Sequence, residues 1–270
     1  MAIPIPGRHF AFNLVQRRTL LFQLVRRDFE TRFIGSAVGW LWGLIHPIVM
    51  LVSWIFVFQV CLHMTTPPNE VTRNYSLFLF CGFLPWLLFQ ETVTRSASSM
   101  LENTNLITKT VFPAEIVPVS IFLSSLISHL IALALVIAVV GIYNGHFSLW
   151  VLFLPVYMFL IGLFSIGVGW IVSSLQVYLR DTSQAISVVL TFWFWMTPIM
   201  ISEQLVPERF RFLLRANPLA VFVRAYRDRL LSYRIPSLHD LAVVAAYAIT
   251  VFVIGGLFFR HLKRGFADVL

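Results

Sequence analysis

Residues 34–62 read IGSAVGWLWGLIHPIVMLVSWIFVFQVCL, a stretch without a single Asp, Glu, Lys or Arg. A helix rises about 1.5 Å per residue and the hydrocarbon core of a bilayer is about 30 Å thick, so about 20 apolar residues suffice to cross it. The stretch therefore predicts a membrane-spanning helix.

Further apolar runs follow this one along the chain. Together with the first they predict an all-α polytopic membrane protein of six transmembrane helices, with the later ones near residues 75–89, 116–143, 147–178, 185–201 and 241–259. The run at 75–89 is short unless Gln90 and Glu91 continue its helix. The composition agrees, because 59% of the residues are hydrophobic and only 12% are charged, against about a quarter charged in soluble domains. Lipid must cover much of such a surface.

The net charge of +8 is better explained by membrane topology than by nucleic acid. Cytoplasmic loops of membrane proteins are basic, and anionic lipid attracts them. Two cysteines, Cys61 and Cys81, lie inside apolar runs and predict neither a disulfide framework nor a metal site.

Residues 1–32 differ in character from residues 33–270, which hold the six predicted helices. Leu20, Leu21, Leu24 and Val25 are apolar and charged residues flank them on both sides, so we predict a cytoplasmic amphipathic helix at the membrane surface. The alternative is a basic segment that serves only as a topology anchor.

Both ends of the chain are basic, and six predicted spans place both termini in the cytoplasm. Residues 202–240 contain seven arginines, yet the same parity places them outside. Either the number of spans differs from six or this segment has its own structure, which its prolines and apolar residues predict to be short amphipathic or re-entrant helices.

The chain lacks the residues for several kinds of chemistry. A phosphate-binding loop needs Lys after Gly, and the two lysines, Lys109 and Lys263, do not follow Gly. The predicted spans hold no paired carboxylates, which argues against a glycosyltransferase and against an ion-coupled carrier. We therefore predict that the chain is not an enzyme and has no catalytic residue, metal or cofactor of its own.

Aromatic residues are concentrated in the first, second and fifth runs. Interfacial belts and lipid contacts account for many of them. Aromatic rings also stack on the apolar faces of sugars, so the alternative is a channel that passes a long hydrophilic glycan. The residues proposed to line it are Trp40, Trp42, Trp54, Phe56, Trp86, Phe89, Phe192, Trp193 and Trp195.

Several motifs, taken in order, resemble those of the type-2 ABC exporter permeases. They are residues 26–42 (RRDFETRFIGSAVGWLW) with Pro47, residues 80–86 (FCGFLPW), 103–107 (NTNLI), 112–113 (FP), 180–181 (RD), 197–199 (TPI), 216–219 (ANPL) and the ending 265–270 (GFADVL). The ending is similar to that of permeases for O-antigen and related polysaccharides. Val38 stands where Leu is commoner in the family. The likeness covers nearly the whole chain.

This resemblance implies a homodimer in the bacterial inner membrane, paired with two copies of a separate ATPase that binds ATP and Mg. It implies export of a lipid-linked polysaccharide, with O-antigen (and so lipopolysaccharide biosynthesis), capsule and teichoic acid as alternatives, and a drug or small lipid as a more distant one. By the same resemblance, the loop at residues 100–112 docks in the ATPase through Glu102, Asn103, Asn105 and Lys109. The N-terminal helix is an interface helix whose Arg26, Arg27 and Arg32 either pack at that interface or hold the pyrophosphate of the lipid carrier.

Overall fold

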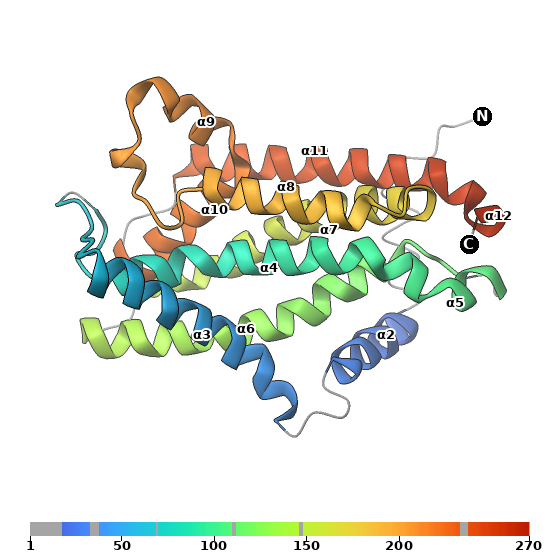
Figure 1. Cartoon of the computed structure of the whole chain (residues 1–270), viewed down its shortest axis with the longest axis horizontal. Helices are drawn as coiled ribbons and strands as arrows, with labels where there is room; N and C mark the ends of the chain where they lie inside the picture. The colour runs from blue at the N-terminus through green and yellow to red at the C-terminus, as the bar shows by residue number, and fades with distance from the viewer. Residues whose placement is uncertain are drawn as a thin grey trace.

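The computed structural model describes residues 18–32, 38–68, 70–109, 112–145, 148–232 and 237–269. Throughout these ranges the regular structure is helical and contains no β-strand (Figure 1). The predicted all-α fold is therefore confirmed.

Four helices in the described ranges are long and apolar enough to cross a membrane. They are α4 (Tyr75–Glu102), α6 (Ile116–Asn144), α7 (Leu154–Tyr178, preceded by η3 at Leu149–Phe153) and α11 (Leu238–Leu262). They match the predicted second, third, fourth and sixth runs. The helix α4 continues well beyond residue 89, and its extra turns carry Glu91 and Arg95.

The first and fifth runs also form helices, but shorter ones. The first comprises η1 (Gly39–Leu41), α3 (Trp42–Trp54) and the π-helical η2 (Ile55–Cys61). The fifth is α8 (Thr182–Met196), whose 15 residues span about 22 Å. It ends before residue 201, the predicted end, because Pro198 disfavours helical geometry at Thr197, which is extended with φ −98° and ψ 133°.

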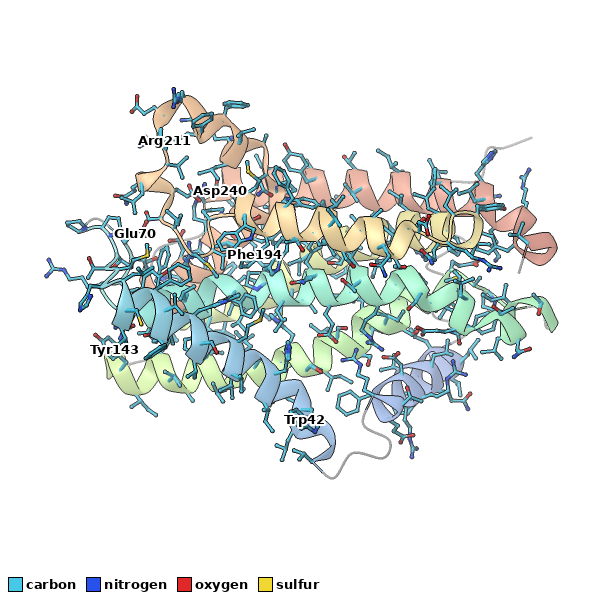
Figure 2. The ribbon with its side chains drawn as sticks, in the orientation of Figure 1. Trp42, Glu70, Tyr143, Phe194, Arg211 and Asp240 are labelled. Carbon is cyan, nitrogen blue, oxygen red and sulfur yellow. The ribbon has the colours of Figure 1, made fainter. Side chains whose placement is uncertain are left out.

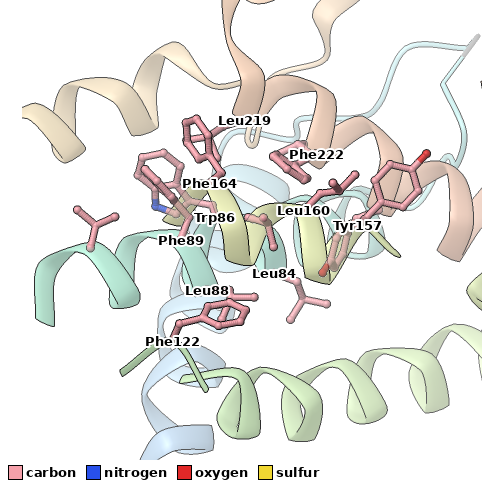
Figure 3. Packing of buried hydrophobic residues seen from close by; sticks show 14 of the residues in the cluster. Leu84, Trp86, Leu88, Phe89, Phe122, Tyr157, Leu160, Phe164, Leu219 and Phe222 are labelled. Carbon is pink, nitrogen blue, oxygen red and sulfur yellow. The ribbon is translucent and has the colours of Figure 1, made fainter. Parts of the chain in front are cut away.

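The helix α4 is the centre of the bundle. In the most apolar stretch of α4, 72% is buried inside the protein, whereas in that of α11 the buried share is 17%. Most of the apolar surface of α11 therefore lies on the outside of the bundle and is left for lipid. Around α4 pack α6, α7, α8 and α10 (Pro218–Arg227). Figure 3 shows the resulting core, with Trp86 and Phe89 of α4 between residues of α7 and α10.

Close backbone approach joins α7 to α11. A Cβ atom on Gly167 would lie 2.6 Å from the carbonyl oxygen of Val251, and a Cβ atom on Gly255 would collide with the backbone of Gly167. Small residues at helix contacts allow this approach, which supplies van der Waals contact in the absence of a hydrophobic driving force between helices in lipid.

The two ends of the bundle differ. At one end, called here the α5 end, lie α2 (Arg18–Thr31), α5 (Thr104–Lys109) and α12 (Phe266–Val269) (Figure 1). The opposite end, called the α9 end, carries the segment 62–74 and a series of short helices. These are η4 (Glu203–Leu205), η5 (Glu208–Phe210), α9 (Arg211–Ala216), α10 and η6 (Asp228–Ser232).

Candidate functional site: helix faces and the two bundle ends

Several of the proposed channel aromatics lie inside the bundle. Trp86 and Phe89 are 1% and 0% exposed, and the indole Nε1 of Trp86 donates to Gln90 Oε1 at 2.6 Å. Trp54 packs on Phe83 and on Phe194, with ring centroids 4.8 and 5.5 Å apart (Phe194 is labelled in Figure 2). In this conformation these rings hold α3, α4 and α8 together.

Trp193 and Trp195 of α8 point in different directions, as a separation of about 200° around a helix predicts. Trp193 packs against Phe89 and donates from Nε1 to Asn217 Oδ1 at 2.9 Å. Trp195 is 63% exposed. Asn217 also bonds Thr197 Oγ1 and caps α10, so Trp193 connects α8 to the α9 end.

Other proposed channel residues lie on open helix faces. Trp42 of α3, Phe56 of η2 and Phe192 of α8 are between 51% and 68% exposed, and Trp42 stands away from the bundle in Figure 2. The side chain of Trp40 lies outside the described residues. The structure thus divides the proposed residues into a packed group and an exposed group.

The exposed faces of α3 and α8 are mixed in chemistry. His46 lies on the same face of α3 as Trp42, and Gln184 lies on the same face of α8 as Trp195, by the 100° turn per residue. Both polar side chains are exposed, and neither has a hydrogen-bond partner among the residues that the structure describes. Unpaired polar groups facing lipid are costly, so these faces suit water or a partner better.

A charge network anchors α2 at the α5 end. Arg32 Nη1 lies 2.5 Å from Glu91 Oε1, and Arg95 Nη2 lies 2.5 Å from Asp28 Oδ1. Ser125 of α6 accepts from Arg32 at 3.1 Å and donates to Glu91 at 3.0 Å. The network ties the amphipathic helix to two long helices by groups that are 14–28% exposed.

The other two predicted basic residues of α2 have separate partners. Arg27 Nη2 donates to Asn103 Oδ1 at 2.6 Å, which joins α2 to the junction of α4 and α5. Arg26 is exposed and pairs with Glu30 one turn along its own helix. Asp28 and Arg95 were missed in the sequence, although the spacing of Glu91 and Arg95 places them on one face of α4.

The predicted coupling residues cluster at the α5 end. Glu102 and Asn105 are exposed and Asn103 is half-buried, with Glu102 Oε1 accepting from Ser98 Oγ at 2.6 Å. They line a cavity of about 670 Å³ together with Arg27, Asp28 and Arg95. The side chain of Lys109 lies outside the described residues.

At the α9 end a buried arginine, unforeseen in the sequence, joins three segments. Arg227 is 5% exposed, and its guanidinium donates to the carbonyl oxygens of Phe78 at 3.1 Å, Pro198 at 2.7 Å and Ile199 at 2.5 Å. It also lies 3.4 Å from the centroid of the Phe78 ring. The sequence feature that could have indicated this buried residue is an arginine on the apolar side of α10.

Metal-ligand geometry is not found in the described ranges, where no group of three or more His, Cys, Asp or Glu side chains could hold an ion. The fold and these sites define the class of protein. It is an all-α polytopic membrane protein with an amphipathic helix anchored at one end of its bundle.

The chain belongs to the ABC-2 type transporter family, whose model matches residues 19–231, and it is a transport subunit of that family. It is 27% identical to an O-antigen export system permease protein of Klebsiella pneumoniae, over 96% of this chain and 98% of that protein. It is 28% identical to one of Myxococcus xanthus, over 95% and 97%. A polysialic acid transport protein of Escherichia coli is 23% identical, over 88% and 91%.

Proposed function

We propose that this chain is the membrane subunit of an exporter that moves a lipid-linked polysaccharide, O-antigen first among the alternatives, across the bacterial cytoplasmic membrane. Similarity over nearly the whole length to O-antigen export permeases carries the proposal. Capsule polysaccharide is the second candidate, because the polysialic acid transport protein is also similar. Teichoic acid follows, and a drug or small lipid is the most distant alternative.

In this proposal the protein works as a homodimer with six spans per subunit, and both termini are cytoplasmic. The exposed faces of α3 and α8 line the path between two copies. The support is their mixture of exposed aromatic rings with His46 and Gln184, which fits a sugar chain better than it fits lipid. Trp42, Phe56, Phe192 and Trp195 would stack on sugar rings, and Trp86, Phe89 and Trp193 would support the helices behind them.

ATP and Mg would bind to two copies of a separate ATPase, docked at the α5 end. Glu102, Asn103 and Asn105 lie there beside α12, which contacts α5. The bond from Arg27 to Asn103 offers a route from this surface to α2. Among Arg26, Arg27 and Arg32, Arg26 is best placed for a carrier pyrophosphate, because its guanidinium is exposed, whereas Arg32 is engaged with Glu91.

The test is complementation. A strain that lacks its O-antigen export permease but keeps its own export ATPase is given this chain, and surface O-antigen is measured by gel and antibody. Restored O-antigen supports the proposal, and a matched strain that lacks its capsule permease tests the second candidate. Purified chain alone should show no ATP hydrolysis, and hydrolysis by chain free of contaminating ATPase would contradict the separate-ATPase arrangement.

A further inference from the structure

A polar cavity at the α9 end is separate from the helix faces and from the α5 end described above. Its volume is about 500 Å³, and it lies between η4, α9, α10 and the first turns of α11. Figure 2 labels two of its residues, Arg211 of α9 and Asp240 of α11. Its lining is Glu203, Gln204, Arg211, Leu214, Arg215, Val221, Arg224, His239, Asp240 and Val243.

The acids of this cavity are paired with one arginine. Arg224 lies 2.8 Å from Glu203 Oε2 and 3.8 Å from Asp240 Oδ2. Three arginines thus face two carboxylates in the lining, and both carboxylates lie beside Arg224. The positive charge that remains is carried by α9.

Two guanidinium groups of α9 supply that charge. Arg211 is oriented by bonds from Nε to the carbonyl of Val206 at 3.1 Å and from Nη2 to that of Gln204 at 3.3 Å. Its nearest acid, Glu208, is 3.6 Å away and 90% exposed, where water screens it. Arg215, one turn further along α9 on the same face, has neither a hydrogen bond nor an ion pair within the described part of the chain.

Exposed aromatic rings adjoin the two arginines of α9 in the sequence. Phe210 and Phe212 are 44% and 61% exposed, next to the cationic face of Arg211 and Arg215. Amphipathic segments of this kind place apolar rings among acyl chains and basic groups at the level of lipid phosphates. Inside the cavity, Leu214, Val221 and Val243 add an apolar wall, which suits a ligand that is charged at one end and hydrocarbon at the other.

We propose that this cavity binds the phosphate of a lipid headgroup, with Arg215 and Arg211 as its hydrogen-bond donors and the apolar wall against the first part of the hydrocarbon. Guanidinium groups bind phosphate oxygens in a bidentate geometry. The lipid is either a membrane phospholipid or a phosphorylated polyprenyl carrier, which present the same chemistry to the site.

The test uses the full chain in detergent and measures its thermal unfolding midpoint as phosphatidylglycerol, a polyprenyl phosphate or inorganic phosphate is added. Ligands that bind only the folded protein raise the midpoint in proportion to their affinity. We expect both lipids to raise it, and Arg215→Gln to weaken the apparent affinity for lipid roughly tenfold. Arg209→Gln is the matched control, because it removes one positive charge from the same segment without touching the cavity.

Each outcome of this experiment either supports or overturns the proposed lipid-phosphate site. A weaker response in Arg215→Gln with a normal one in Arg209→Gln supports the site, and the stronger of the two lipids identifies the source of the phosphate. The proposed site is overturned if lipid raises the unfolding midpoint of Arg215→Gln and Arg209→Gln equally, or if both variants lose this rise to the same extent. Stabilisation by inorganic phosphate as large as that by lipid overturns the assignment to a lipid. Arg211→Gln is the second variant. Because Arg211 also bonds the backbone at Val206, this variant is judged by its apparent affinity for lipid and not by its own unfolding midpoint.

Discussion

Arg32, the residue that follows α2, and Glu91 of α4 are 59 residues apart in sequence, and their side chains meet with Nη1 and Oε1 at 2.5 Å. The contact holds the amphipathic helix against α4 toward the α5 end of the bundle. Arg95, Asp28 and Ser125 complete the network, in which Asp28 also lies 3.5 Å from Arg32. The loss of Glu91 therefore leaves two poorly solvated arginines, Arg32 and Arg95, to share the one carboxylate of Asp28.

Glu91→Ala should therefore destabilise the protein, by about 1–3 kcal/mol, since a partly buried charge loses its partner. Thermal unfolding in detergent measures the effect. Glu30→Ala is the control, because its pair with Arg26 is exposed and its loss should change little. The idea fails if the two variants unfold at the same temperature.

The surface at the α5 end should carry coupling to the ATPase. Glu102→Lys reverses an exposed charge there and should reduce assembly with the ATPase or ATP-driven export several-fold, because the partner meets the wrong charge. Co-purification and surface glycan measure the two steps. Glu208→Lys makes the same change at the opposite end and should be neutral. Normal assembly and export with Glu102→Lys would count against the coupling surface.

The aromatic residues of α8 should divide into two groups. Trp195→Ala and Phe192→Ala should reduce surface glycan and leave thermal stability within about 0.5 kcal/mol of the original. Trp193→Ala should lower stability by about 2–4 kcal/mol, because it removes a packed ring and leaves Asn217 without its indole donor.

The exposed aromatics of α3 provide the second half of this experiment. Trp42→Ala should resemble Trp195→Ala, with export reduced and expression unchanged. Normal export in all of Trp42→Ala, Phe192→Ala and Trp195→Ala would mean that the rings contact lipid or a partner subunit and do not line a glycan path.

The α9 end should face the outside of the cell. Ser202 is unsuited to thiol labelling because it is 3% exposed and bonded to Glu70, whereas the Glu208 side chain is 90% exposed. Glu208→Cys, in a background without Cys61 and Cys81, should react with an impermeant thiol reagent added to intact spheroplasts. Reaction only after the spheroplasts are opened would reverse the topology.

Gly82 and Arg227 should be coupled. A Cβ atom on Gly82 would lie 2.5 Å from Arg227 Nη2, and three carbonyl bonds hold that guanidinium in place. Gly82→Ala should destabilise the protein by about 1–3 kcal/mol and should do so much less in an Arg227→Ala background. Unfolding of the two single variants and the double variant measures this; strictly additive effects would show that the contact is not tight.

The class of fold could be read from local patterns. Uncharged runs such as residues 34–62 and 116–143 predict helices by length and hydropathy, because lipid forces the backbone to satisfy its own hydrogen bonds. The short helices of the segment 202–232 follow likewise from its prolines and amphipathic character. The family resemblance rests on ordered motifs, which are also local.

Contacts between distant segments needed the tertiary structure. The sequence shows Trp86 and Trp195 as equivalent aromatics in apolar runs, yet one is 1% and the other 63% exposed. Hydropathy measures whether a residue leaves water, and it does not distinguish lipid, a neighbouring helix or a channel as the place it goes to. The same holds for charge. Only the packing of α2 on α4 and α6 decides that Arg32 meets Glu91. Only the fold of the α9 end places Arg227 among three carbonyls and Arg215 at the edge of a cavity, where no other described residue pairs with it.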